Sequence, residues 1–110
     1  MFIHKEQIST ESSCGTIELP FQTIEEAREN IMYLAIQNNN AYMWFNTDKI
    51  NNATRDVYGI IALETETDMK NQLKPEDYIG TIANSSKELH YFLMSLDDMT
   101  KYIMQGEKRQ

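Results

Sequence analysis

The sequence predicts an α+β fold, in which a small antiparallel sheet of about four strands, in ββαββα-like order, packs with two main helices. Two apolar runs, 41–45 (AYMWF) and 57–63 (VYGIIAL), carry apolar side chains at both alternating positions, which is typical of strands buried on both faces. Two other segments, beginning at Thr23 and Ser85, combine a helix-capping box with apolar residues spaced three and four apart. We therefore expect the two runs to form the centre of the sheet and the helices to cover it.

The first elements are expected to be two short strands. Residues 1–8 begin with a β-like Phe-Ile pair, and 15–19 (GTIEL) alternates apolar and polar side chains. The polar stretch 9–13 between them has the composition of a turn, and Pro20 ends the second strand because it cannot donate to a ladder. An N-terminal hairpin is one arrangement that this pattern allows.

The first helix is expected over 24–37. The Thr23 hydroxyl is placed to accept from the amide of Glu26, whose carboxylate can reach back to the helix start. Asparagines 38–40 follow, and Asn tolerates the left-handed conformation that ends many helices. The apolar face consists of Ile24, Ala27, Ile31, Leu34 and Ala35.

The two central runs need cover on both faces. They are joined by the polar, Asn-rich connection 46–56, which is expected to be an exposed loop. Gly59 interrupts the second run and indicates either a bulge or the close approach of another backbone. Only two long helices are expected, so either helices cover both faces, or one face is closed by the N-terminal hairpin or by a second subunit. A homodimer is therefore one expectation.

The segment 75–83 has two interpretations. Pro75 followed by two acidic residues is typical of a helix first turn, and the apolar residues that follow fall at helical spacing. Gly80 and Thr81 favour a short strand instead. We expect a helix, with the strand as the alternative.

The last helix is expected from Ser85 to Gly106. Ser85 and Glu88 form its capping box, and Gly106 is a good helix stop. A further cap-like box over 95–98 (SLDD) predicts, as an alternative, a break into two helices. The apolar face consists of Leu89, Phe92, Leu93, Leu96, Met99 and Ile103.

Length and composition predict one domain spanning 1–110, with a short flexible tail over 107–110. The single cysteine, Cys14, excludes an internal disulfide and any multi-cysteine zinc site. The N-terminus lacks a signal-peptide core, and no apolar run approaches the roughly 18 residues of a membrane span. We therefore expect a cytoplasmic protein that does not insert into a membrane.

The net charge of −7 is spread over both halves of the chain, so no basic patch is expected. Such a surface repels phosphate backbones, which argues against direct binding of nucleic acid. Acidity serves solubility in many proteins, and it also suits association with a basic protein surface.

No pattern in the sequence indicates catalysis, a metal site or a cofactor. His4 and His90 have no second ligand at metal-binding spacing, and Cys14 has no neighbouring positive charge to activate it. The alternating carboxylates of Glu64, Glu66 and Asp68 resemble the start of a calcium loop, but methionine stands where the loop needs glycine.

The function expected is that of a small acidic, non-enzymatic regulatory module that binds a protein partner. One form of it is an inhibitor that occupies a basic, nucleic-acid-binding surface, as small phage-encoded inhibitors do. Tyrosine and methionine supply adaptable contact area at interfaces, and the chain has six tyrosines. The alternative is a small-ligand-binding domain or minor enzyme with a pocket near Trp44 and Tyr58. The expected partner-binding residues are Glu64, Glu66, Asp68, Tyr91, Met94, Asp97, Asp98 and Tyr102.

Overall fold

A computed structural model of the chain describes residues 2–47, 55–66, 73–83 and 87–107. The elements in chain order are β1 (Ile3–Ile8), β2 (Ser13–Leu19), α1 (Ile24–Asn30), β3 (Ile31–Gln37), β4 (Asn40–Asn46), β5 (Asp56–Glu64), the 3₁₀ turn η1 (Pro75–Asp77), β6 (Tyr78–Ala83), β7 (Glu88–Met94) and α2 (Leu96–Glu107).

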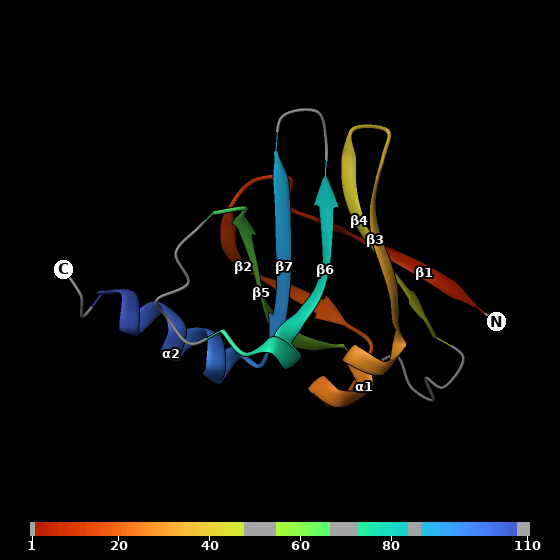
Figure 1. Cartoon of the computed structure of the whole chain (residues 1–110). Coiled ribbons are helices and arrows are strands. Elements are labelled where there is room, and N and C mark those ends of the chain that lie inside the picture. The colour runs from red at the N-terminus through yellow and green to blue at the C-terminus, as the bar shows by residue number, and fades with distance from the viewer. Residues whose placement is uncertain (1, 48–54, 67–72, 84–86, 108–110) are drawn as a thin grey trace.

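The strands form two antiparallel sheets, which confirms the α+β class but not the single four-stranded sheet (Figure 1). Sheet A has the order β1-β4-β3, and sheet B has the order β2-β5-β7-β6. The runs 41–45 and 57–63 are both interior strands, as expected, but each lies in a different sheet. The predicted ββαββα order is therefore matched only roughly.

The main core lies between the two sheets. Phe21 and Phe45 pack edge to face across it, with ring centroids 5.6 Å apart. Where β3 and β6 come together, Leu34 packs onto Gly80, whose φ of +153° favours glycine. The buried residues of this core are Ile8, Ile17, Leu19, Phe21, Ala27, Ala41, Met43, Phe45, Tyr58, Ala62, Ile82, Leu89, Tyr91 and Leu93.

Helix α2 covers the opposite face of sheet B and buries a second, smaller cluster of Ile61, Phe92, Met94 and Met99. Gly59 lies directly beneath the helix: a Cβ atom added there would lie 2.6 Å from the Cβ of Met99. The close approach that the sequence indicated at Gly59 is therefore that of helix α2. In Figure 1 α2 lies on the side of sheet B away from sheet A.

The predicted helix over 24–37 is wrong beyond Asn30, because β3 occupies 31–37. This stretch (IMYLAIQ) pairs with β4, and β-branched and aromatic residues suit a pleated surface better than a helix. Asn38 and Asn39 have φ of 54° and 68°, so they form the two-residue loop of a hairpin rather than a helix end.

The strand alternative is correct for the segment after η1, since residues 78–83 form β6. The helix expected from Ser85 is wrong over 88–94, which form β7. The inter-sheet core and α2 cover the two faces of β7, so its residues are apolar almost without interruption. Such a run contains helical spacing as well as strand alternation. The cap expected at Ser95 is confirmed: the amide of Asp98 donates to Ser95 Oγ (3.1 Å), and α2 begins at Leu96.

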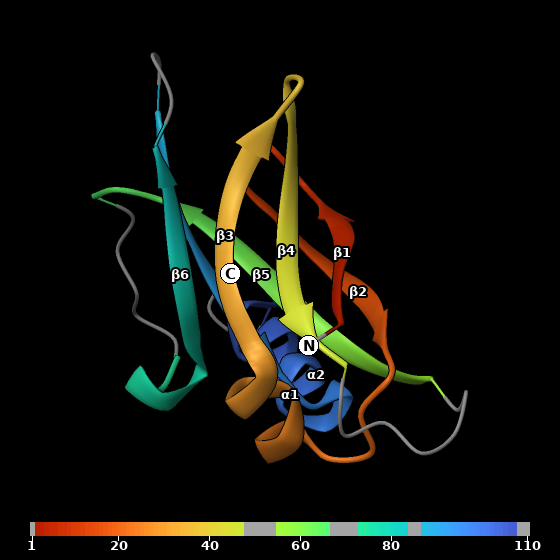
Figure 2. The ribbon, with the colours of Figure 1, turned by 90° about the vertical axis from the view of Figure 1, so that its right-hand side faces the viewer.

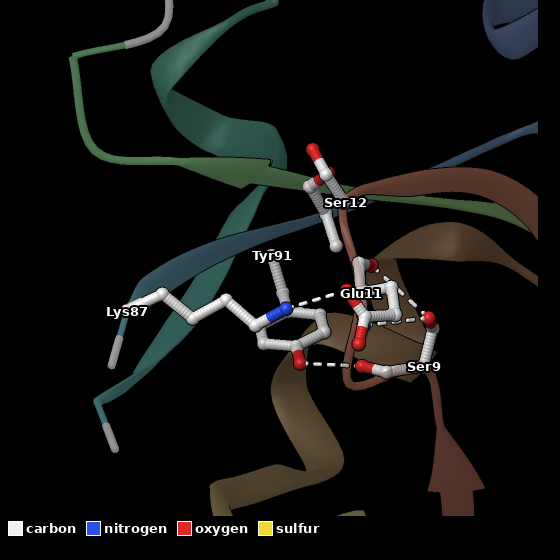
Figure 3. Close-up of polar contacts among 6 residues, drawn as sticks. Ser9, Glu11, Ser12, Lys87 and Tyr91 are labelled. Carbon is white, nitrogen blue, oxygen red and sulfur yellow. Dashed lines mark hydrogen bonds and ion pairs between the residues drawn. The ribbon is translucent and has the colours of Figure 1, made fainter. Parts of the chain in front are cut away.

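No N-terminal hairpin forms, because β1 pairs with β4 and β2 pairs with β5. The turn between them passes from sheet A to sheet B and is anchored to β7 (Figure 3). The Tyr91 hydroxyl donates to the Ser9 carbonyl (2.6 Å), and Lys87 forms an ion pair with Glu11. Burial raises the pKa of Tyr91 to about 12, so this hydroxyl remains a donor at neutral pH.

We expect Tyr91→Phe to lower the free energy of unfolding by about 1 kcal/mol, because it removes the bond that holds the turn. Urea denaturation of the two proteins measures the difference. Tyr78→Phe is the control: the Tyr78 side chain is exposed and its hydroxyl bonds Thr81 Oγ1 at the surface, so the loss of this hydroxyl should change stability by less than about 0.5 kcal/mol. Equal effects of the two substitutions would contradict the anchoring role.

Candidate functional site

The segment before α1 and the first residues of α2 flank the start of β5, where they line a shallow hollow of about 430 Å³. Figure 1 shows both helices at the same end of the molecule. We call this feature the acidic hollow. Its lining residues are Gln22, Asp56, Val57, Tyr58, Ser95, Leu96 and Asp97.

Helix capping places the acidic side chains on the α1 side of the hollow. The amide of Glu26 donates to Thr23 Oγ1 (3.1 Å), and the Glu26 carboxylate accepts from the amide of Gln22 (3.1 Å). The predicted capping box is therefore present, except that the Glu26 carboxylate accepts from the amide of Gln22 and not from that of Thr23. Glu25 lies in the same first turn, where the helix dipole stabilises negative charge.

The α2 side is built in the same way. Ser95 caps the helix through the amide of Asp98, and Asp97 and Asp98 occupy its first turn. Asp97 is exposed and lines the hollow, whereas Asp98 is half-buried and faces a neighbouring pocket. Two unrelated caps therefore bring carboxylates to one place on the surface.

Tyr58 lies near the carboxylates of β5 and α1. Its hydroxyl donates to the Phe21 carbonyl (2.6 Å) inside the core. Burial raises the pKa of Tyr58, and the negative charges of Asp56, Glu26 and Glu25 raise it further. The floor of the hollow is therefore a region of negative potential to which both α1 and β5 contribute.

Two apolar side chains are exposed within this acidic surface. Val57 and Leu96 each keep 40% of their surface in contact with solvent, although both line the hollow. Apolar contact area surrounded by charge is the common composition of a protein-binding surface, with the apolar centre providing affinity and the charged rim providing orientation.

The structure brings together only some of the predicted partner-binding residues. Asp97 lines the acidic hollow, while Asp98 and Tyr102 line the neighbouring pocket of about 150 Å³, beside Asp77 and Lys101.

Met94 is 1% exposed on β7 but lines the same pocket as Asp98 and Tyr102. The remaining predicted site residues lie elsewhere: Tyr91, also on β7, is 1% exposed and is not a surface residue. Glu64, the last residue of β5, and Glu66 just after it are both exposed, and Glu64 is about 23 Å of extended chain from Val57. Asp68 is outside the described residues.

Sequence reasoning missed Asp56, Val57, Glu25 and Leu96 as members of one surface. In the sequence, Glu25 was interpreted as a helix-dipole residue and Asp56 as the end of a loop, so neither indicated a shared surface. No local signal shows that the starts of α1, β5 and α2 converge, since that depends on the two-sheet topology. Within the described ranges, no group of three or more His, Cys, Asp or Glu side chains is arranged to hold a metal ion.

The pocket expected near Trp44 and Tyr58 is not formed by these two side chains. Trp44 stacks on Tyr33 at the outer surface of sheet A, whereas Tyr58 is buried in the core between the sheets. They belong to different sheets, and Tyr58 lines the acidic hollow.

No family model, curated protein or solved structure matches this chain significantly. None of the helices in the described ranges has the length and apolar character needed to cross a membrane.

Proposed function

We propose that this chain is a small acidic interaction module, without enzymatic activity, that binds a protein partner through the acidic hollow. The observation that carries the proposal is the placement of exposed Val57 and Leu96 among carboxylates at the ends of two capped helices. A partner that fits this surface presents one or two apolar side chains between Lys or Arg residues.

The charge distribution supports a basic partner. Asp56 and Asp97 line the hollow, and Glu25 and Glu26 add negative charge beside it. These charges would attract a basic surface over a distance and speed association, while the apolar contact slows dissociation. A Lys/Arg-rich surface that normally binds nucleic acid has this character, and a module seated on it would act as an inhibitor in the cytoplasm.

The proposal predicts that Asp56→Lys/Asp97→Lys binds the partner about a hundredfold more weakly than the natural chain, through the loss of two close charge pairs and the addition of repulsion. The partner is identified by capture from the source cell with mass spectrometry, and affinities are then measured by calorimetry on purified proteins. The natural chain's affinity should fall steeply as salt is raised.

Glu64→Lys/Glu66→Lys is the matched control, since it changes the net charge by the same amount at the other end of β5. It should leave the affinity within about threefold, provided that circular dichroism shows both variants folded. Loss of binding in the control alone would place the partner at Glu64 and Glu66 and overturn the assignment to the hollow. Capture of no stoichiometric partner by the natural chain would overturn the proposed function.

A further inference from the structure

The outer face of sheet A carries aromatic side chains that no described helix or strand covers. Figure 2 shows this sheet toward the viewer, with α2 behind it. Tyr33 is 51% exposed, and Tyr42 and Trp44 are half-buried. We call this surface the aromatic face; strand pairing assigns to it Ile3, Lys5 and Gln7 of β1, Asn40, Tyr42, Trp44 and Asn46 of β4, and Tyr33, Ala35 and Gln37 of β3.

The aromatic rings hold one another in place. Tyr33 stacks on Trp44 across the strands, with centroids 4.9 Å apart and an interplanar angle of 11°. Tyr42 meets Trp44 edge to face at 5.7 Å. Rings fixed by such contacts form a ridge that needs little ordering when a ligand binds, which favours affinity.

The charge of the aromatic face differs from that of the rest of the chain. None of the 17 Asp and Glu residues is among its side chains, and Lys5 is its single cation. The absence of carboxylates makes it unsuited to the basic partner proposed for the acidic hollow. One ammonium group on a chain of net charge −7 is also too little to hold a nucleic-acid backbone.

Internal hydrogen bonds occupy acceptor atoms on this face. Lys5 Nζ donates to Gln37 Oε1 (2.6 Å) and lies 4.4 Å from the centre of the Tyr42 ring. Gln7 Nε2 donates to Asn40 Oδ1 (3.4 Å). The indole N–H of Trp44 can only donate and the tyrosine hydroxyls can donate, whereas Gln37 Oε1 and Asn40 Oδ1 already accept internal bonds, so the face favours a ligand that is rich in acceptors.

The size of the face selects an extended ligand rather than a second copy. Three strands of about seven residues give a strip of about 20 by 14 Å, or about 300 Å². A stable protein dimer buries about 800 Å² on each partner, so this strip alone is too small. It matches the length of about six residues in polyproline II conformation, at about 3.1 Å per residue.

We propose that the aromatic face binds a proline-rich segment of a partner protein in the polyproline II conformation. Proline rings pack against Tyr33 and Trp44, and the carbonyl groups of the segment accept from the donors of the ridge. Proline has no N–H group, so the segment does not need the acceptor atoms already taken by Lys5 and Gln7. The rigid polyproline conformation also limits the entropy lost on binding.

The test is calorimetric titration of the full chain with decaproline, with the emission of Trp44, the single tryptophan, as a second signal. We expect one-to-one binding with a dissociation constant of about 100 μM, and no binding of a Gly-Ser peptide of equal length. Tyr33→Ala should weaken binding at least about tenfold. Tyr78→Ala, which removes a similarly exposed ring from sheet B, should leave it unchanged.

Three results would overturn the proposal. The first is the absence of decaproline binding at millimolar concentration by a folded chain. The second is binding of a neutral oligosaccharide such as cellohexaose in place of decaproline, because its hydroxyl groups need acceptors as well as donors. The third is a concentration-dependent dimer in sedimentation that Tyr33→Ala abolishes, which would make a second copy the occupant.

Discussion

We expect Gly59→Ala to lower the free energy of unfolding by about 3 kcal/mol, because α2 leaves no room for a side chain at this point of β5. The added Cβ would lie 2.6 Å from Met99 Cβ and 2.8 Å from Met99 Sδ. A contact between two Cβ atoms cannot be relieved by a change of rotamer, so the helix itself must move. Thermal and urea unfolding measure the loss.

Gly15→Ala is the matched control for this prediction. Gly15 lies on β2, next to β5, and a Cβ added there meets no atom within 4 Å. The substitution should change stability by less than about 1 kcal/mol, since the lost backbone freedom of the unfolded chain favours alanine. Met99→Ala combined with Gly59→Ala should not restore stability, because alanine keeps the clashing Cβ. Equal unfolding curves for Gly59→Ala and Gly15→Ala would show that α2 does not pack on Gly59.

The sequence predicted the elements whose signals are local. The capping box at Thr23 and the cap at Ser95 both exist, and the runs 41–45 and 57–63 are interior strands. It failed over 31–37 and 88–94, where the apolar residues of β3 and β7 also fall at helical spacing. The apolar residues of β7 satisfy helical and strand spacing equally, and only the presence of a core on one face and α2 on the other decides between them.

The candidate site was less predictable than the fold. Asp97 was identified, but as part of a surface with Glu64 and Glu66, from which the length of β5 separates it. Tyr91 and Met94 were expected on the surface of a helix, but they belong to β7 and are both buried. The expected cover on both faces is present for β5, which lies between the core and α2, but the described elements leave the outer face of β4 open as the aromatic face.

A second large effect is expected at the ion pair of Arg28 and Asp77, which joins α1 to η1. Asp77 is 4% exposed and pairs with Arg28, which also donates to the Leu93 carbonyl (3.3 Å). Burial raises the pKa of Asp77 above its ordinary value of 3.8, although the charge of Arg28 lowers it. Desolvation therefore outweighs attraction, and Arg28 is the largest of the interactions that favour the ionised carboxylate.

We expect Arg28→Met to lower the free energy of unfolding by about 3 kcal/mol at pH 7, since it leaves a buried carboxylate without its partner. Removing the arginine also raises the pKa of Asp77 further. An acid whose pKa is higher in the folded than in the unfolded state loses its stability penalty as pH falls through the folded-state value. The loss of stability in Arg28→Met should therefore be largest at neutral pH and should become smaller as the pH falls towards 3.8, the ordinary pKa of an aspartate. Thermal unfolding at several pH values measures it.

The double variant Arg28→Met/Asp77→Asn separates charge from packing. Without a carboxylate at position 77 the desolvation penalty disappears, so the double variant should be more stable than Arg28→Met at pH 7 and should show no comparable gain on acidification. A deficit of Arg28→Met that is constant with pH and not reduced by Asp77→Asn would mean that Arg28 acts through its packing and its bond to Leu93, and that the charge of Asp77 is immaterial to the fold.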